Sequence, residues 1–422
     1  MNPHAYRRCT MSKMSRYMLV LMTVLAAAVS LPALYWLAFE KPVSAPFILY
    51  SASENDFIIL RHLKGEVVRT DRKGTVYTRE DYEKKLPLFF ARQLFVSGSM
   101  PDSLHGKAME MQAIAEARSS FRYRPSDMRS PKPGLYPMFE SASGRARLEL
   151  PDDYFRIDAR MEFIDAESNT LNEAKSQAFT EALNKQSFQF PATMVAGLPT
   201  TRKSCDEGYF IVDSQNELFH VKMIGAAPSV RKISPPKGLP FKHIACVDFP
   251  DKKYYCYLIS ADNSVWILSQ DDYEFVRLPL DGLVPETDEL RIFGNMFNYT
   301  LSMRRQAYIK VVALDSLYRK VDEYEEHWRP RAESIQGRIA GFLFPAEIGL
   351  ARGNSRFLNL YVERTRGFNF LFLHLLLLVI QFFIIRKTGL RLRNNLTDLL
   401  IVAVCGLYGF IAVNFFQNRF FD

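Results

Sequence analysis

Cysteine is scarce in this 422-residue sequence, and its five cysteines form no metal-binding or redox pattern. No C-x-x-C pair is present, and no cysteine and histidine cluster at the spacing of a zinc site. The seven histidines are scattered without an H-E-x-x-H pair, and no G-x-G-x-x-G occurs. We therefore expect no metal site, no cofactor, and no catalytic or cofactor-binding residues.

Acidic residues are missing where the basic residues concentrate. The chain has 54 Lys and Arg against 46 Asp and Glu, a net charge of +8. Residues 1–16 hold four basic residues and no acid, and residues 386–398 hold four and a single acid, Asp398. The stretch 40–366 is nearly neutral. This distribution indicates membrane topology and excludes a nucleic-acid-binding surface as the source of the basic charge.

Charge is absent from three apolar segments, each about as long as a bilayer-spanning helix. They predict transmembrane helices at 17–39, 367–385 and 399–416. The two basic clusters place 1–16 and the loop 386–398 in the cytoplasm. The domain 40–366 and the C-terminus 417–422 would then lie in the periplasm of a bacterium, with the helices in its inner membrane.

The first apolar segment has an alternative, a cleaved signal peptide, because basic residues precede it. The run is longer than a usual signal core. The nearest cleavage-like site ends at Ala33 but has Leu31 where a small residue is required. An uncleaved anchor is the favoured interpretation.

Short strands separated by turn residues dominate residues 40–366. A strand, a polar turn with Asp, and a second strand recur around Asp71, Asp213, Asp262 and, more loosely, Asp315. Strand-rich pieces at 145–165 and 339–363 resemble further units. Such a period predicts a mainly β, propeller-like domain of about five to seven blades. A β-sandwich or several smaller β modules are the alternative.

Helical insertions interrupt this pattern near 79–119 and 170–185. Thr78 and Asp81 form a capping-box pattern ahead of a helix that Pro87 interrupts. His105–Ser119 and Thr170–Lys185 have helical patterns as well. Residues 123–144, rich in Pro, Ser and Gly, predict a loop.

Few side chains suggest chemistry. Cys205 with His220 would resemble a nucleophile and its base, but nothing places them together, and a turn cysteine is favoured. Cys246 and Cys256 flank a turn, and either a cross-strand disulfide or two buried thiols fits the sequence.

Acidic and phosphate-loop patterns are equally weak. The neighbouring acids at 152–153, 271–272 and 325–326 are expected at the solvated surface, because adjacent residues do not converge on one cleft. Gly106-Lys107 lacks the remainder of a P-loop. Asp213, Gln215 and Glu217 lack the glycine and final glutamate of a calcium loop.

Polar residues also occur inside the predicted C-terminal helices. His374 and Gln381 are seven residues apart and share one helical face, and Asn414 lies in the following segment. Such groups mark either function or hydrogen bonds between helices, and we expect the latter.

Two stretches carry a family resemblance: RLELPDDYFRIDARMEFIDAESNTLNEAKSQAFTEAL and FPATMVAGLPTTRKSCDEGYFIVDSQNELFHVK. With the flanking helices they resemble an uncharacterised family of membrane-anchored proteins from Bacteroidales. The resemblance carries no catalytic residues. It implies a genetic neighbourhood with transporter-type ATPases, and this chain has no ATP-binding motif of its own.

We therefore expect a non-enzymatic, membrane-anchored periplasmic binding or accessory subunit, with an ABC-type transporter as the expected assembly. Its partners would be the lipid bilayer and a transporter ATPase or permease. The alternatives are a membrane-tethered envelope hydrolase with its site in the propeller channel, and a structural envelope scaffold.

Overall fold

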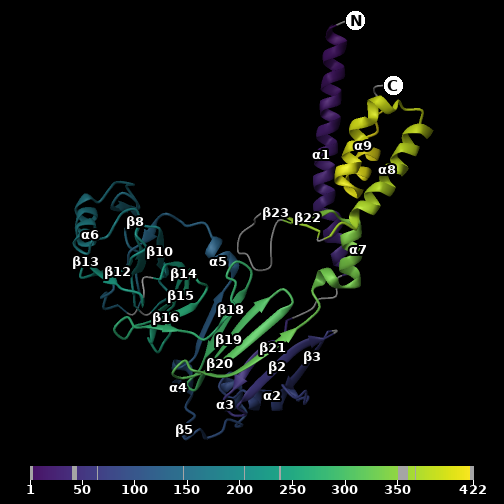
Figure 1. The fold of residues 1–422 in the computed structure, drawn as a ribbon. Coiled ribbons are helices and arrows are strands. Elements are labelled where there is room, and N and C mark those ends of the chain that lie inside the picture. The colour runs from purple at the N-terminus through teal and green to yellow at the C-terminus, as the bar shows by residue number, and fades with distance from the viewer. Residues whose placement is uncertain are drawn as a thin grey trace. The chain divides into compact units, whose positions relative to one another are not determined.

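The computed structural model describes residues 3–39, 45–63, 65–145, 147–203, 205–236, 239–349, 360–365 and 367–418 (Figure 1), with side chains from Lys13 onward. The Cys9 side chain and residues 419–422 of the predicted periplasmic segment 417–422 lie outside the described part of the chain. The chain divides into two compact units. The helical unit comprises Met1–Val43 and His327–Asp422, and the β unit comprises Ser44–Glu326.

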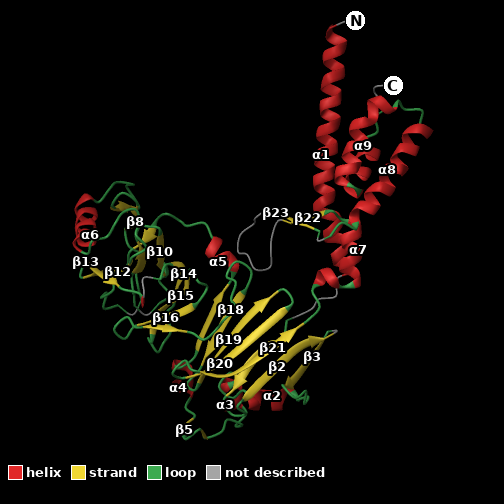
Figure 2. Cartoon of the chain, viewed as in Figure 1, coloured by secondary structure: helices red, strands yellow, loops and turns green. Residues whose placement is uncertain are grey.

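Helices form most of the helical unit (Figure 2). Its elements are α1 (Pro3–Phe39), η2 (Arg331–Glu333), α7 (Ile335–Leu343), β22 (Ala346–Gly349), β23 (Tyr361–Arg364), α8 (Phe370–Lys387), η3 (Leu392–Asn395), α9 (Leu396–Cys405) and α10 (Leu407–Phe415). Val20 of α1 packs with Leu377 of α8, Val402 of α9 and Ala412 of α10. Strands β22 and β23 pair antiparallel beside α1. The strand-rich piece predicted at 339–363 therefore belongs to this unit and is no propeller blade.

The third predicted transmembrane helix, at 399–416, is wrong as a single helix. The segment is broken at Gly406 into α9 and α10, and Gly406 has a φ of 55°. A Cβ at Gly406 would lie 2.0 Å from Nε2 of His374, so only glycine fits this turn. In the described residues, two helices remain long and apolar enough to cross a membrane, Lys13–Phe39 and Phe370–Lys387.

The chain reverses direction at this break. Asp398, in the first turn of α9, and the carbonyl of Phe416, just after α10, both accept hydrogen bonds from Arg16. Asn418 also donates to the carbonyl of Asn394, at 3.0 Å. A Cβ at Gly409 would lie 2.5 Å from the Ile401 carbonyl oxygen, so this second glycine lets α10 approach α9. The segment is thus a short helical hairpin whose two ends lie together.

The β unit is mainly β and consists of small antiparallel sheets. Its strands are β1 (Phe47–Ser51), β2 (Asp56–Leu63), β3 (Glu66–Asp71), β4 (Ser103–Leu104), β5 (Lys107–Ala108), β6 (Ser119–Tyr123), β7 (Tyr136–Pro137), β8 (Asp153–Ile157), β9 (Met161–Asp165), β10 (Met194–Gly197), β11 (Tyr209–Val212), β12 (Leu218–Ile224), β13 (Ala227–Ile233), β14 (Phe241–Cys246), β15 (Tyr254–Ser260), β16 (Val265–Ser269), β17 (Phe275–Arg277), β18 (Glu289–Gly294), β19 (Asn298–Arg305), β20 (Tyr308–Asp315) and β21 (Lys320–His327).

Most sheets follow the chain order. They are β1-β2-β3, β7-β8-β9, β10-β11-β12-β13 and β14-β15-β16-β17, with β4-β5 as a separate two-stranded ribbon. The exception is the five-stranded sheet β21-β20-β19-β18-β6, in which the early strand β6 pairs antiparallel with β18. Its inner face carries a core in which Leu290, Leu301 and Leu314 are fully buried.

Three of the four recurring Asp residues occupy hairpin turns, between β11 and β12, β15 and β16, and β20 and β21. Asp213 accepts hydrogen bonds from the backbone N–H groups of residues 215 and 217, and Asp315 from those of residues 317 and 319. Asp262 accepts one from Ser264. Each carboxylate satisfies donors that the turn leaves unpaired, which explains the repeated position. Around Asp71 the second run forms only a bridge, Thr70 to Val76, and no hairpin.

Helices of the β unit are short: α2 (Arg79–Lys85), α3 (Ala91–Val96), α4 (Met111–Glu116), α5 (Pro125–Arg129) and α6 (Glu173–Lys185). The Thr78 side chain caps α2 by accepting from the Asp81 N–H. The helix predicted at 105–119 is wrong over its first half, where Lys107–Ala108 pairs with β4 instead. Helix α6 lies against β9, and its Phe179 and Leu183 are fully buried.

Candidate functional site

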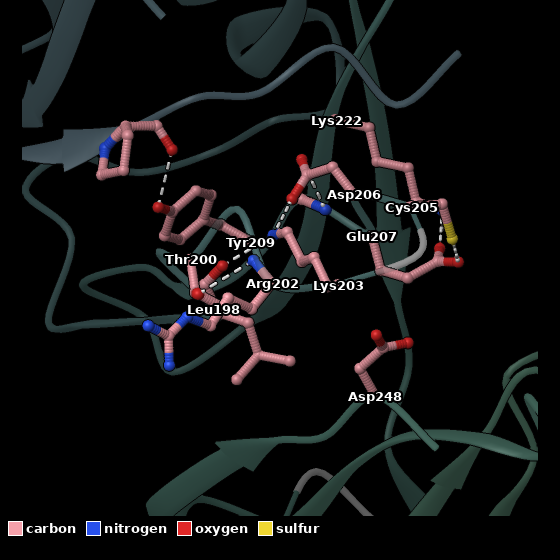
Figure 3. A network of polar contacts seen from close by, with 12 residues as sticks. Leu198, Thr200, Arg202, Lys203, Cys205, Asp206, Glu207, Tyr209, Lys222 and Asp248 are labelled. Atoms are coloured by element: carbon pink, nitrogen blue, oxygen red, sulfur yellow. Dashed lines mark hydrogen bonds and ion pairs between the residues drawn. The ribbon is translucent and has the colours of Figure 1, made fainter. Parts of the chain in front are cut away.

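A buried polar network of the β unit involves residues 198–203 and 205–208, between β10 and β11 (Figure 3). Lys203 forms an ion pair with Asp206 and also donates to the Leu198 carbonyl at 2.6 Å. Both ionic side chains are buried, and Asp206 also accepts from the Gly208 N–H at 3.1 Å. Burial raises the pKa of Asp206 despite the nearby ammonium. The pair fixes the loop onto β11.

Glu207 extends the network toward β12. Its carboxylate forms an ion pair with Lys222 and accepts a hydrogen bond from the Cys205 thiol at 3.3 Å. Burial alone would raise the pKa of Glu207, but Lys222, the Cys205 thiol and Lys252 together outweigh it and lower the pKa. Burial, followed by the Glu207 carboxylate, raises the pKa of Cys205. These surroundings disfavour the thiolate, which is the nucleophilic form of cysteine.

His220 of β12 is near Cys205 but not in contact with it. Its Nε2 is 2.5 Å from the Glu207 carbonyl oxygen, and its Nδ1 is 2.7 Å from the Tyr273 hydroxyl. The ring stacks on Phe210 at 4.2 Å and is 2% exposed. Burial lowers the pKa of His220 to about 4. Both ring nitrogens are engaged, so His220 is a neutral core residue rather than a base for Cys205.

Little space adjoins this network. The cavity between Cys205, Glu207 and Asp248 has a volume of about 10 Å³. That volume holds about one water molecule. The network therefore lacks room for a substrate. Its contacts stabilise the loop between β10 and β11.

Cys246 and Cys256 lie directly opposite each other on β14 and β15, and both are free thiols. Burial raises the pKa of Cys246 to about 12. The Val247 N–H donates to the Tyr255 carbonyl, so the neighbouring Cys pair occupies a non-hydrogen-bonded position, where side chains approach closely. Of the two sequence alternatives, the structure has separate thiols, with Cys256 buried and Cys246 partly buried.

The remaining acidic candidates do not converge. Asp153 forms an ion pair with Lys175, Glu325 with Lys310, and Glu326 with Arg61. Gly106 lies in the turn of the β4-β5 ribbon rather than in a phosphate loop. Across the described ranges, no three His, Cys, Asp or Glu side chains could together hold a metal ion.

Polar residues of the helical unit pair with one another. The Asn414 amide donates to Oε1 of Gln381 at 2.6 Å, which confirms the expected hydrogen bond between helices. His374 contacts the Ala403 carbonyl through Nδ1 at 3.0 Å. These contacts join α8 to α10 and α9, so the three predicted polar residues stabilise helix packing.

The sequence did not reveal a buried contact in the helical unit, the ion pair between Arg16 and Asp398. Arg16 donates to both carboxylate oxygens, at 2.9 and 2.6 Å, and through Nε to the Phe416 carbonyl at 2.7 Å. The two side chains are 7% and 4% exposed. The partners are 382 residues apart. In the sequence, Arg16 and Asp398 were interpreted separately, as single charges in the distribution that indicates membrane topology.

Comparison with known proteins gives a family without an activity. The family described as a domain of unknown function (DUF4857) matches residues 47–314. No curated protein matches the sequence at a significant level.

Several solved structures are weakly similar. The Dos1 propeller is 10% identical with a TM-score of 0.24, over 44% of this chain and 46% of that chain. PorZ, a surface component of the type-IX secretion system of Porphyromonas gingivalis, is 11% identical with a TM-score of 0.22, over 68% of this chain and 32% of that chain. The N-terminal domain of Nup159 is 10% identical with a TM-score of 0.20, over 68% and 76%. This chain thus spans less than half the length of the first two, and likenesses this weak carry no functional argument.

Proposed function

Because the chain belongs to the DUF4857 family, to which no activity is assigned, we propose a function from its own structure: a non-enzymatic, membrane-anchored binding or accessory subunit of a membrane assembly. The observation that carries this proposal is the helical unit. Its two long helices are apolar, yet only 22% and 28% of their apolar windows are buried within the chain. Surfaces of this kind are stable in lipid and not in water.

The ion pair between Arg16 and Asp398 supports retention of α1 in the mature protein. A cleaved signal peptide would remove Arg16 and leave Asp398 buried without its partner, at a cost of several kcal/mol. The basic residues of 1–16 and of the loop after α8 support a cytoplasmic location for both. The β unit then lies in the periplasm, and the membrane is the bacterial inner membrane.

The reversal at Gly406 changes the topology that we propose. Helices α9 and α10 have 10 and 9 residues, too few for either to span a bilayer. They form a re-entrant hairpin, which is tolerated at membrane depth where its irregular backbone packs on protein. The C-terminus then lies in the cytoplasm rather than in the periplasm.

The β unit provides the binding surface. Its four-stranded sheets β10–β13 and β14–β17 follow one another along the chain and have the strand number of propeller blades. We propose that they are blade-like modules of an incomplete propeller. The polar networks at Cys205 and His220 are internally satisfied, which supports binding rather than hydrolysis as the role of this unit.

The partner that we propose is a transporter permease with its ATPase. The exposed faces of α1 and α8 carry large apolar side chains that suit partner helices as well as lipid, including Leu25, Leu34, Leu375, Leu376 and Phe383. The chain would contribute the periplasmic domain and the partner would contribute energy coupling.

Copurification tests this function. A tagged full-length chain is solubilised from native membranes in a mild detergent, and copurifying proteins are quantified by mass spectrometry against an untagged strain. We expect a multi-span permease and an ATPase in stoichiometric amounts. Recovery of the chain alone would refute the accessory role. If washing the membranes with alkali releases the chain into the soluble fraction, the membrane anchor would be refuted.

A further inference from the structure

A cavity of about 200 Å³ lies in the β unit beside the first strand, β1, and against one face of β18 and β19. One water molecule needs roughly 10–15 Å³ of such volume, so the cavity has room for a group of several heavy atoms. It is much larger than the space beside Cys205, and none of its lining residues belongs to the network of Figure 3.

Strand register brings the polar lining together. Glu289 is opposite Arg304, and Arg291 is opposite Ser302, in the antiparallel pair β18–β19. Side chains two residues apart on a strand share a face, so all four lie on one side of the sheet. His62 of β2 also lines the cavity. The site therefore joins two sheets that are far apart in sequence.

The single acid in this lining is already neutralised. Glu289 accepts from Nε and Nη2 of Arg122 at 2.7 and 2.9 Å, and from Nε of Arg291 at 2.5 Å. Burial alone would raise the pKa of Glu289, but the two guanidinium groups outweigh it and lower the pKa. Both carboxylate oxygens are thus committed to cations.

Basic donors of the lining remain available. Arg291 contacts Glu289 through Nε, which leaves its two Nη groups as donors. Arg304 is exposed, and neither it nor His62 has a side-chain hydrogen bond or ion pair with any residue in the described part of the chain. The guanidinium fork matches the geometry of carboxylate and phosphate oxygens. The lining therefore favours a negatively charged ligand.

An apolar wall completes the cavity. Phe47 and Phe293 meet edge to face at 5.7 Å, and Ile309 lies beside Arg304 in the register of β19 and β20. This wall suits the carbon portion of a ligand whose charged end meets the arginines.

We propose that this cavity binds an oxyanion, a phosphate or carboxylate group carried by a small molecule or by a lipid headgroup. Arg304 and Arg291 bind the oxygens, Glu289 holds Arg291 in place, and the aromatic wall contacts the remainder of the ligand. The proposal deepens the binding role proposed above by naming its ligand chemistry. The cavity itself does not depend on a partner or on membrane anchoring.

The test uses the full-length protein in a mild non-ionic detergent. Its thermal unfolding is followed while sodium phosphate replaces sodium chloride at constant ionic strength, so that general screening stays unchanged. We expect a saturable rise in Tm, because a ligand that binds only the folded state stabilises it. The variant R304Q should weaken phosphate binding about ten-fold, the effect of losing one charge-assisted hydrogen-bond partner.

A matched control separates binding from stability. Arg92 of α3 is exposed, makes no ionic contact in the described ranges, and lies outside the cavity, so R92Q should leave the phosphate response unchanged. Because Arg304 is exposed, R304Q should fold like the wild type, and its Tm without phosphate checks this.

Two further arms distinguish the source of the oxyanion. Succinate replaces phosphate in one, and a short-chain phosphatidylglycerol is compared with a short-chain phosphatidylcholine in the other. An Arg304-dependent response to any of these anions supports the site, and a response to phosphatidylglycerol alone identifies a lipid headgroup. If no probe gives a saturable response, or if R304Q responds like R92Q, the proposal is overturned. This result would not affect the copurification test, which does not involve the cavity.

Discussion

The ion pair between Arg16 and Asp398 gives the sharpest test of how the helical unit is held together. The substitution D398L removes the carboxylate and leaves the Arg16 guanidinium buried, with the Phe416 carbonyl as its remaining acceptor among the described residues. Both side chains are less than a tenth exposed, so solvent cannot replace the lost partner. Breaking such a pair costs about 3–5 kcal/mol of unfolding free energy.

The double variant R16M/D398L should recover most of this loss. Replacing both members of a buried pair with apolar residues of similar size is often neutral, because no uncompensated charge remains. The two single losses would therefore be strongly non-additive, as expected for residues in direct contact. The control R393M removes an exposed arginine after α8 and should change the unfolding free energy by about 0.5 kcal/mol or less.

The measurement is unfolding in mixed micelles of mild detergent and dodecyl sulfate, followed by far-ultraviolet circular dichroism. The expected order of stability is wild type and R393M first, then R16M/D398L, then D398L. A cost for D398L no larger than that of R393M would contradict the buried pair. A double variant whose loss equals the sum of the losses measured for D398L and for R16M alone would contradict the direct contact.

Three further predictions follow from other contacts. G406A should lower the Tm in detergent and the unfolding free energy by about 2 kcal/mol or more, because its Cβ would overlap His374 at a positive φ. The control G389A is also at positive φ but has open space around it, so its unfolding free energy should fall by only about 1 kcal/mol. For His220, the unfolded state takes up a proton near pH 6.5 and the folded state only near 4, so the unfolding free energy should fall as pH decreases through that window, by at most about 3 kcal/mol. Denaturant titrations of H220Q should show a flatter dependence of unfolding free energy on pH, and an unchanged dependence would refute the assignment. Cys205 should react with iodoacetamide more slowly in the folded protein than in the unfolded protein near neutral pH, because burial raises its thiol pKa. The rate is read by intact mass, and equal rates would mean that the thiol is accessible and ionised.

Local chemistry made part of the fold predictable. The turns at Asp213, Asp262 and Asp315 recur because a carboxylate at that position binds the N–H groups of its own turn. Such contacts lie within four residues, so the sequence pattern contains them completely. The same holds for the capping of α2 by Thr78.

Long-range contacts made the rest unpredictable. The segment 399–416 has the length and composition of a spanning helix, and its break depends on His374, which lies against Gly406. The two glycines at 406 and 409 were the available signal, but glycine is common in membrane helices and does not by itself indicate a reversal. The topology expected for the C-terminus changed for this reason.

The candidate sites show the same division. His374, Gln381 and Asn414 were predicted to be polar groups between helices, because their residue type in an apolar segment is informative alone. The cavity at Arg291 and Arg304 was not predicted, since it depends on a register between strands and on the nearby β1 and β2. No spacing in the linear sequence shows that one acid there is shared by two arginines.

The pairing of β6 with β18 has a consequence for the order of events during synthesis. Residues 124–288, which include three complete sheets, separate the two strands. At about 5–20 residues per second, the ribosome needs roughly ten to thirty seconds to supply the partner of β6. During that interval β6 is a nascent edge strand with unpaired backbone groups, which is a hazard for aggregation. Slow translation or a holding chaperone at this stage should therefore matter more to the yield of folded protein than it would for a chain of consecutive hairpins.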